Sequence, residues 1–219
     1  LDFHAKVFDA TYAWSWYDAV HQITANKADL ADLIKYYAHN EKSFPADCLR
    51  MTFVSNHDKN TWEGTEFEQF DEGLEAAIVL SVVSEGIPLI YNGQEAGNTK
   101  RLEFFEKDPI SWREHPLGEL YKKLFALKKE ASALWNGAWG ARMIYVPNNV
   151  PANVLSFVRQ DERSKVFAVF NFSGSPQTVT FQESLCQGRY RDYFSQEYVE
   201  LIATTQISLK PWGYRVFVK

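Results

Sequence analysis

The sequence predicts an α/β region followed by an all-β region. In residues 1–138, short apolar runs alternate with segments of helical periodicity. From about Ala141 onward, only short runs recur, separated by turn residues. The first pattern is typical of a parallel sheet with right-handed helical crossovers, and the second of an antiparallel sandwich. We therefore expect two domains, residues 1–138 and 139–219.

The first region contains three apolar, β-prone runs, which are the candidate strands Lys6–Phe8, Met51–Val54 and Leu89–Tyr91. Between and after them, apolar side chains recur at helical spacing in residues 12–23, 30–37, 67–82 and 117–133. Asn26 is the expected N-cap of the second helix, and Thr65 with Glu68 fits a capping box for the third. Gly86 is expected to stop that third helix.

The second region shows seven short runs with turn chemistry between them. They are Arg142–Val146, Val154–Arg159, Val166–Phe172, Thr178–Phe181, Tyr190–Phe194, Gln206–Leu209 and Tyr214–Val218. Evenly spaced short strands without helices indicate an antiparallel β-sandwich.

Composition excludes several classes of function. The 219 residues carry a net charge of −5 and no basic stripe, so nucleic acid is not an expected partner. No apolar run reaches the ~18–20 residues that span a bilayer, so no membrane partner is expected either. The two cysteines form no CxxC or Cys/His cluster, which argues against zinc. The compartment stays undecided, with an extracellular or periplasmic bacterial location favoured over the cytoplasm. Because the chain begins at Leu1, we expect a processed protein or a fragment.

Three strands are few for a parallel sheet, because both of its edges would be left open. A (β/α)₈ barrel needs eight strands and ~250 residues. The first region is therefore either a small open sheet or the last part of a barrel whose earlier strands lie outside this chain.

Polar residues follow directly after the second candidate strand, in the triplet Asn56-His57-Asp58. Functional side chains of parallel β/α folds sit at the carboxyl ends of strands. Asp58 could bind substrate hydroxyls beside a hydrogen bond from His57. Alternatively, the triplet caps a helix or stabilises a turn.

A second carboxylate, Glu95, follows the third candidate strand. Since glycoside hydrolysis uses two carboxylates that flank one bond, Asp58 and Glu95 could form such a pair. Glu95 could equally be held by structural hydrogen bonds. The loop that follows carries Phe104, Phe105, Asp108 and Trp112. This loop either lines a sugar-binding site with aromatic rings that stack on the sugar, or packs as an ordinary surface loop.

Together, these motifs resemble the α-amylase family of glycoside hydrolases (family 13). Residues 53–58 (Phe-Val-Ser-Asn-His-Asp) resemble the family's fourth conserved region, at the end of the seventh barrel strand. Residues 86–95 (Gly-Ile-Pro-Leu-Ile-Tyr-Asn-Gly-Gln-Glu) resemble its eighth strand. Residues 62–67 and 104–110 are similar to bacterial members that act on α-glucans. The resemblance implies the last three β/α units of a (β/α)₈ barrel, followed by the family's C-terminal β-sandwich.

The resemblance also implies site roles. Asp58 corresponds to the carboxylate that accepts hydrogen bonds from hydroxyls of the sugar at the cleavage point and stabilises the transition state. His57 corresponds to the hydrogen-bonding neighbour of that carboxylate. Asn56, Asp108 and Trp62 are further substrate-binding candidates, and Glu95 becomes a site-supporting residue rather than an acid. The expected substrates of the intact enzyme are α-1,4-glucans such as starch and maltooligosaccharides, cleaved with retention.

The chain departs from the family in one respect. The nucleophile in a Gly-x-Arg-x-Asp pattern and the Glu that acts as general acid do not occur here, so we expect this chain alone to be inactive. Neither a metal nor another cofactor is expected in this chain, although calcium is possible in the intact enzyme. Alternatives are a non-catalytic carbohydrate-binding or interaction module, or half of a two-chain barrel. Open barrel edges also predict self-association or binding of a complementing N-terminal barrel portion.

Overall fold

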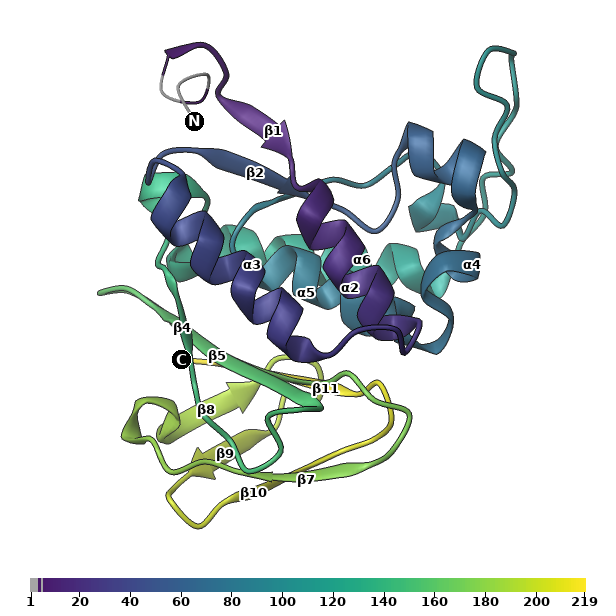
Figure 1. The fold of residues 1–219 in the computed structure, drawn as a ribbon. Coiled ribbons are helices and arrows are strands. Elements are labelled where there is room, and N and C mark those ends of the chain that lie inside the picture. Colours follow the sequence, from purple (N-terminus) through teal and green to yellow (C-terminus); the bar gives the residue numbers. More distant parts are fainter. Residues whose placement is uncertain (1–3, 5) are drawn as a thin grey trace.

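A computed structural model describes residues 4 and 6–219 (Figure 1). The first half contains a three-stranded parallel sheet in the order β1 (Ala10–Tyr12), β2 (Leu49–Thr52) and β3 (Ile87–Pro88). The connections between these strands are helical. Helices α2 (Trp14–Thr24) and α3 (Leu30–Ser43) join β1 to β2, and α4 (Glu66–Phe70) and α5 (Leu74–Val83) lie between β2 and β3. Helix α6 (Pro116–Glu130) follows β3.

The order of strands and helices agrees with the sequence prediction, but the first strand does not. Lys6–Phe8 is not a strand; Val7 and Phe8 are 63% and 54% exposed, and the strand begins at Ala10. The apolar character of Val7 and Phe8 suggested a strand, whereas the residues that pair with β2 are Ala10–Tyr12, and Tyr12 is followed by the buried Ala13. The other two strands lie about two residues earlier than predicted.

Two helix-boundary predictions also differ. Asp29, not Asn26, is the N-cap of α3: its Oδ1 accepts a 2.8 Å hydrogen bond from the Ala31 amide. Asn26 has a φ of 55° and lies in the turn before. The capping box of Thr65 and Glu68 is confirmed, with both reciprocal bonds present.

The helix predicted from residue 67 to 82 is broken into α4 and α5 by a short 3₁₀ turn, Asp71–Gly73. A Cβ atom on Gly73 would lie 2.5 Å from Thr24 Cγ2, so the break lets the backbone pass close to the end of α2. Helix α5 is buried at every residue except Glu75. Gly86 does not cap it in the left-handed conformation, because the chain already becomes extended at Ser84.

The second half is an antiparallel β structure, as predicted. A six-stranded sheet has the order β4-β5-β6-β11-β8-β9, and β7 pairs with β10 in a second sheet. The strand bounds are β4 Met143–Tyr145, β5 Val154–Gln160, β6 Lys165–Asn171, β7 Gln177–Thr180, β8 Gly188–Asp192, β9 Tyr198–Leu201, β10 Gln206–Leu209 and β11 Tyr214–Val218. Strand β9 has no counterpart among the seven predicted runs.

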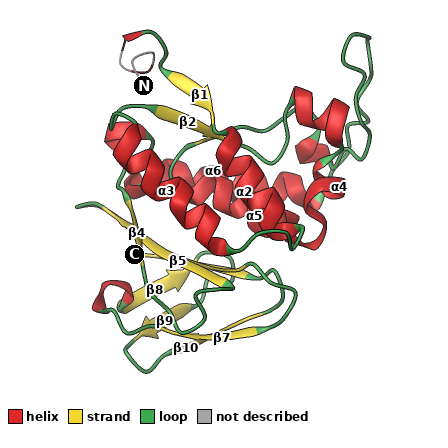
Figure 2. Ribbon diagram, in the orientation of Figure 1, coloured by secondary structure: helices red, strands yellow, loops and turns green. Residues whose placement is uncertain are grey.

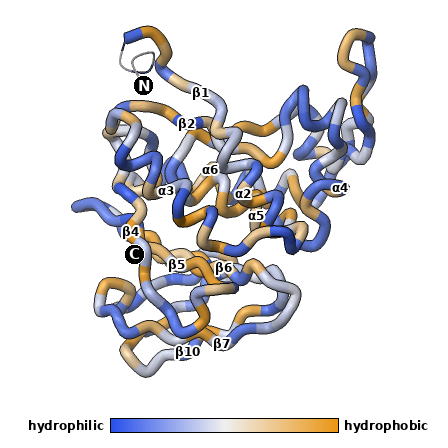
Figure 3. The backbone as a smooth tube through the Cα atoms, in the orientation of Figure 1, coloured by the Kyte–Doolittle hydropathy of each residue, from blue (hydrophilic) through white to orange (hydrophobic). Residues whose placement is uncertain are grey.

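The strands β5 and β6 of the larger sheet are buried on both faces. Along β5, Leu155 and Phe157 belong to a core shared with the helices, whereas Val154 and Val158 belong to a second core against β7 and β10. In Figure 2 the helices form a layer between the parallel sheet and the antiparallel strands, and Figure 3 shows hydrophobic colour along β5 and β6. One hydrophobic core therefore runs across the predicted boundary at residues 138/139.

The buried Arg159 connects the two halves, and the buried Lys128 shares one of its acceptors, Leu134 O, from within the first half. The Arg159 guanidinium at the end of β5 donates to the carbonyls of Ser84 and Trp135, both at 2.8 Å, and Lys128 Nζ of α6 donates to Val82 O and Leu134 O at 3.1 and 2.7 Å. The carbonyl ends of α5 attract positive charge because of the helix dipole. In the described part of the chain, no helix is long and apolar enough to cross a bilayer.

Candidate functional site

The triplet Asn56-His57-Asp58 lies just beyond the carboxyl end of β2. Phe53 and Val54 are buried in the core and carry the chain from the strand to Asn56. Asn56 is itself fully buried, and its Oδ1 accepts a 2.8 Å hydrogen bond from the Lys59 amide. This bond starts a helical turn that continues as a π-helix, η1 (Lys59–Glu63). Asn56 thus has the capping role that was the alternative interpretation, and a substrate contact for it stays a prediction.

His57 and Asp58 face outward from this turn. Their side chains are 51% and 45% exposed, and His57 Nε2 lies 3.7 Å from Asp58 Oδ1. Among the described residues, Asp58 has no other polar partner. A carboxylate held at a strand end with its lone pairs directed to solvent is suited to accept hydrogen bonds from a polyhydroxylated ligand.

Lys59 connects this turn to helix α2. Its side chain is only 10% exposed, and its ammonium lies 2.8 and 2.9 Å from the two carboxylate oxygens of Glu63 and 4.4 Å from the ring centre of Tyr17 in α2. Burial of the charge is therefore compensated by an ion pair and a cation–π contact. The sequence analysis missed Lys59, although its spacing of four residues from Glu63 is a helical ion-pair signal.

The loop of residues 98–112 is attached to the same turn. Asn60 Oδ1 accepts from the Leu102 amide at 2.8 Å, and Thr61 Oγ1 donates to the Leu102 carbonyl at 2.7 Å. Arg101 donates to both carboxylate oxygens of Glu68 at 2.8 and 3.1 Å. These contacts join segments about forty residues apart in the sequence and hold the loop beside His57.

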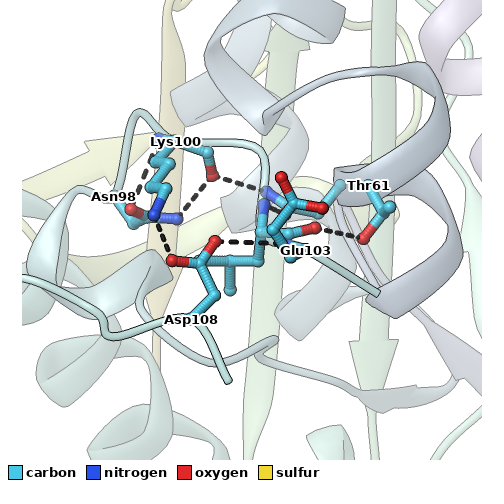
Figure 4. Close-up of polar contacts among 7 residues, drawn as sticks. Thr61, Asn98, Lys100, Glu103 and Asp108 are labelled. Atoms are coloured by element: carbon cyan, nitrogen blue, oxygen red, sulfur yellow. Dashed lines mark hydrogen bonds and ion pairs between the residues drawn. The ribbon is translucent and has the colours of Figure 1, made fainter. Parts of the chain in front are cut away.

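Asp108 supports this loop from within (Figure 4). Its side chain is 8% exposed; one oxygen pairs with Lys100, and the other accepts a 3.0 Å hydrogen bond from the Glu103 amide. The Lys100 ammonium and the Glu103 amide hold the pKa of Asp108 below its usual range. Both oxygens are thus occupied inside the loop, and binding of substrate by Asp108 stays a prediction.

The structure separates the aromatic residues of the region into two groups. The Phe104 ring lies 6.0 Å from His57, 5.5 Å from Trp62 and 4.8 Å from Phe105, measured between ring centres. Trp112 instead lines a cleft between the segment that follows β3 and helix α6. Trp62 therefore lies beside Phe104, which contacts His57, whereas Trp112 does not join that group; substrate binding by Trp62 stays a prediction.

Glu95 lies in a short 3₁₀ turn after β3, Gln94–Ala96. Glu95 and Trp112 line the same cleft, and the volume of this cleft is about 1020 Å³. The Oε2 atom of Glu95 is buried without a hydrogen-bond partner in the described chain. Asp58 is not among the described residues that line this cleft. A supporting role for Glu95 stays a prediction.

No group of three or more His, Cys, Asp or Glu side chains in the described residues is placed to hold a metal ion. The two cysteines, Cys48 and Cys186, are not bonded to each other.

Two family models match the chain. The model described as "Alpha amylase, catalytic domain" matches residues 4–127, and that of "Maltogenic Amylase, C-terminal domain" matches residues 144–216. The first match alone covers more than half of the chain. This chain belongs to the α-amylase family.

Curated members of the family are similar over most of the chain. "Alpha-amylase 2" of Dictyoglomus thermophilum is 22% identical over 97% of this chain, and "Alpha-amylase MalA" of Haloarcula japonica is 27% identical over 87%. The chain spans 37% and 29% of the length of these two relatives.

Solved structures of amylases share the fold. The "noncanonic maltogenic alpha-amylase AmyB" of Thermotoga neapolitana superposes on 99% of this chain with a TM-score of 0.84 at 20% identity, and the chain covers 52% of it. The structure of AmyP in complex with maltose gives a TM-score of 0.75 over 96% of the chain at 14% identity, with 50% of AmyP covered.

Proposed function

We propose that this chain is the C-terminal portion of an α-glucan hydrolase, comprising the last three β/α units of a (β/α)₈ barrel and a β-sandwich domain. The parallel order β1-β2-β3 with helical crossovers supports this assignment, as do the matches to both family models. Within such a barrel, the ends of β2 and β3 would lie at the catalytic face.

The proposed role of the site is to hold a glucose unit of an α-1,4-glucan at the point of cleavage. The observation that carries this proposal is the Asp58 carboxylate, which is 45% exposed and lies 3.7 Å from His57. Hydrogen bonds from a sugar hydroxyl to this carboxylate would strengthen as positive charge develops on the sugar ring, so they stabilise an oxocarbenium-like transition state. His57 would donate to a neighbouring hydroxyl and orient the sugar.

The intact enzyme is proposed to act with retention, and the 219-residue chain to be inactive alone. Retention requires a carboxylate nucleophile and a general acid, and neither family pattern occurs in this sequence. Asp58 cannot replace both groups, because the covalent step and protonation of the leaving group need two carboxyl groups on opposite sides of one bond.

Binding and turnover test these two statements separately. Titration of the chain with maltotriose, followed by chemical-shift changes, should give millimolar binding that Asp58→Asn abolishes. The matched control is Glu162→Gln, which removes an exposed carboxylate from a turn of the β region. Binding that is equal in Asp58→Asn and the unmodified chain would refute the role of Asp58. Release of reducing sugar from starch by the purified chain would refute its inactivity.

A second candidate function is that of one half of a two-chain barrel. The cleft lined by Ile90, Tyr121 and Phe125 favours it, because this open surface lies beside β3, the edge strand of the parallel sheet in the described chain. Co-purification of a second polypeptide with the native protein would support this function. In-frame coding sequence for the missing strands immediately upstream would favour a single-chain enzyme, and an unrelated upstream domain a carbohydrate-binding module.

A further inference from the structure

A small cavity lies where the first half of the chain meets the β region. Its volume is about 40 Å³, and its wall contains residues of β2, residues 85–86 after α5 and residues of the segments that form β4 and β5. Since a buried water needs about 10–15 Å³ of such space, the cavity has room for one small ligand and excludes a sugar. His57 and Asp58 are not among the described residues that line it, so the cavity is separate from the candidate glucan site.

Three guanidinium groups and one carboxylate line this cavity. The arginines are Arg50 of β2, Arg142 before β4 and Arg159 of β5. The carboxylate is that of Glu85, whose Oε2 lies 3.2 Å from Arg142 Nη1 and whose Oε1 accepts a hydrogen bond from the Met143 amide. The described wall of the cavity therefore carries two more positive charges than negative ones.

The other described lining residues do not offset this excess of positive charge. All of them are uncharged by type except Cys48, whose thiol could ionise. Burial raises the pKa of the Cys48 thiol, so the thiol stays protonated and neutral near neutral pH. Charges that face a small enclosed space interact more strongly than charges in water, so the cavity favours an anion over a neutral ligand.

Arg50 supplies a buried donor that lacks an acceptor. Its Nη1 donates to Thr11 Oγ1 at 2.7 Å, and its guanidinium carbon lies 4.5 Å from the centre of the Phe44 ring. Its Nε is buried and has no hydrogen-bond partner among the described residues. A buried donor without an acceptor is costly, and the N–H groups of a guanidinium bind an anion more strongly than a neutral acceptor. A ligand in the cavity that accepts from Arg50 Nε would therefore stabilise the fold.

We propose that this cavity binds a single-atom anion such as chloride, which connects the parallel sheet to the β region. The anion accepts a hydrogen bond from Arg50 and offsets the positive charge of Arg142 and Arg159. The donors of Arg159 already bind carbonyls, among them Ala141 O at 2.9 Å, so Arg159 contributes its charge and not a further hydrogen bond. The stability of the chain thus depends on the anion. This inference is independent of the proposed role of Asp58.

Thermal unfolding of the full chain tests the proposal. The Tm is measured in sodium chloride and in sodium methanesulfonate at equal ionic strength, so that screening of surface charges is the same in both salts. Chloride at ten times its dissociation constant should raise the Tm by about 3–6 °C, because an ion that binds only the folded chain stabilises it by mass action. Methanesulfonate is a larger anion and should give no such rise.

Two variants of the lining residues and one control locate the effect. Arg50→Gln removes the buried donor and should abolish the chloride dependence of the Tm. Arg142→Gln removes a positive charge at a side chain that is 45% exposed, so the chain should fold and the half-saturating chloride concentration should rise about tenfold. The control Arg189→Gln removes an arginine with a similar ring contact, 5.1 Å from the centre of Tyr198, and should leave the chloride dependence unchanged.

A crystal grown in sodium bromide gives the position of the ion directly. Anomalous scattering should show a bromide peak in the cavity beside Arg50, and this result holds even if Arg50→Gln fails to fold. An equal Tm in the two salts would mean that the cavity holds only water, and would overturn the proposal. A chloride effect that persists unchanged in Arg142→Gln, or bromide peaks that all lie outside the cavity, would overturn it as well. None of these measurements involves sugar binding, so their failure leaves the proposed function untouched.

Discussion

Replacing Arg159 by methionine should destabilise the whole chain by about 3–5 kcal/mol, because the backbone carbonyls that accept hydrogen bonds from its guanidinium would lose their donor. Arg159 is 2% exposed; its Nη1 donates to the carbonyls of Val83 and Ser84 at 3.3 and 2.8 Å, and its Nη2 donates to the carbonyl of Trp135 at 2.8 Å. A methionine of similar length fills most of the space but leaves these buried carbonyls unpaired. Each unpaired buried group costs about 1–3 kcal/mol, so three at the lower limit already give about 3 kcal/mol.

The assay is urea unfolding, followed by tryptophan fluorescence and by far-ultraviolet circular dichroism. Arg159→Lys keeps the positive charge but lacks the planar guanidinium with its several donors, so its loss of unfolding free energy should be intermediate. The control Arg189→Met removes an exposed guanidinium and should stay within about 0.5 kcal/mol of the parent. A loss below about 1 kcal/mol in Arg159→Met would refute the reasoning, because the carbonyls would then have found other partners.

Three further predictions concern buried charges and the open edge. Burial and the nearby Arg159 lower the pKa of Lys128 to about 7, so above that pH the unfolded chain binds more protons than the folded chain. The free energy of unfolding should therefore rise between pH 7 and 10, by up to about 1.4 kcal/mol per pH unit. In urea titrations Lys128→Met should flatten this slope, whereas the control Lys123→Met should not. Burial raises the pKa of Glu66 to about 7, so its ionisation should reduce stability as pH rises from about 4.3 to 7, and Glu66→Gln should remove that decline in the same titrations. The chain should self-associate through the cleft beside α6, and Phe125→Lys should shift light scattering toward the monomer; a monomeric parent at high concentration would contradict this.

The sequence predicted the order of elements well, because that order is encoded locally. Apolar periodicity located α2, α3 and α6 within a few residues, and turn residues separated most strands of the second half. Strand β9 was missed because Tyr198–Leu201 is an edge strand with alternating exposed residues, one of them a glutamate, which reads as a loop. The break between α4 and α5 depends on Gly73 approaching Thr24, a tertiary contact that periodicity does not register.

In the candidate site, too, local motifs could be predicted from the sequence and long-range contacts could not. The triplet was visible because polar residues at a strand end form a compact motif, and Trp62, Phe104 and Phe105 were visible as aromatic residues. Their grouping was not, since it depends on bonds from Asn60 and Thr61 to Leu102 across about forty residues. The same long-range geometry moved Trp112 away from Phe104 and placed it with Glu95.

The change of sequence texture near Ala141 marks a change of secondary structure, but the core does not divide there. Leu155, Phe157 and Arg159 alternate along β5 on the face toward the helices, so one row of a strand supplies both apolar packing and the charged contact to the end of α5. A sheet that separates as an independent domain needs a polar outer face, with alternating burial along its strands. Strand β5 is instead buried from Val154 to Arg159. The helices and the β region therefore stabilise one another, although no hydrogen bond or ion pair within the described residues joins the β region to Asn56, His57 or Asp58.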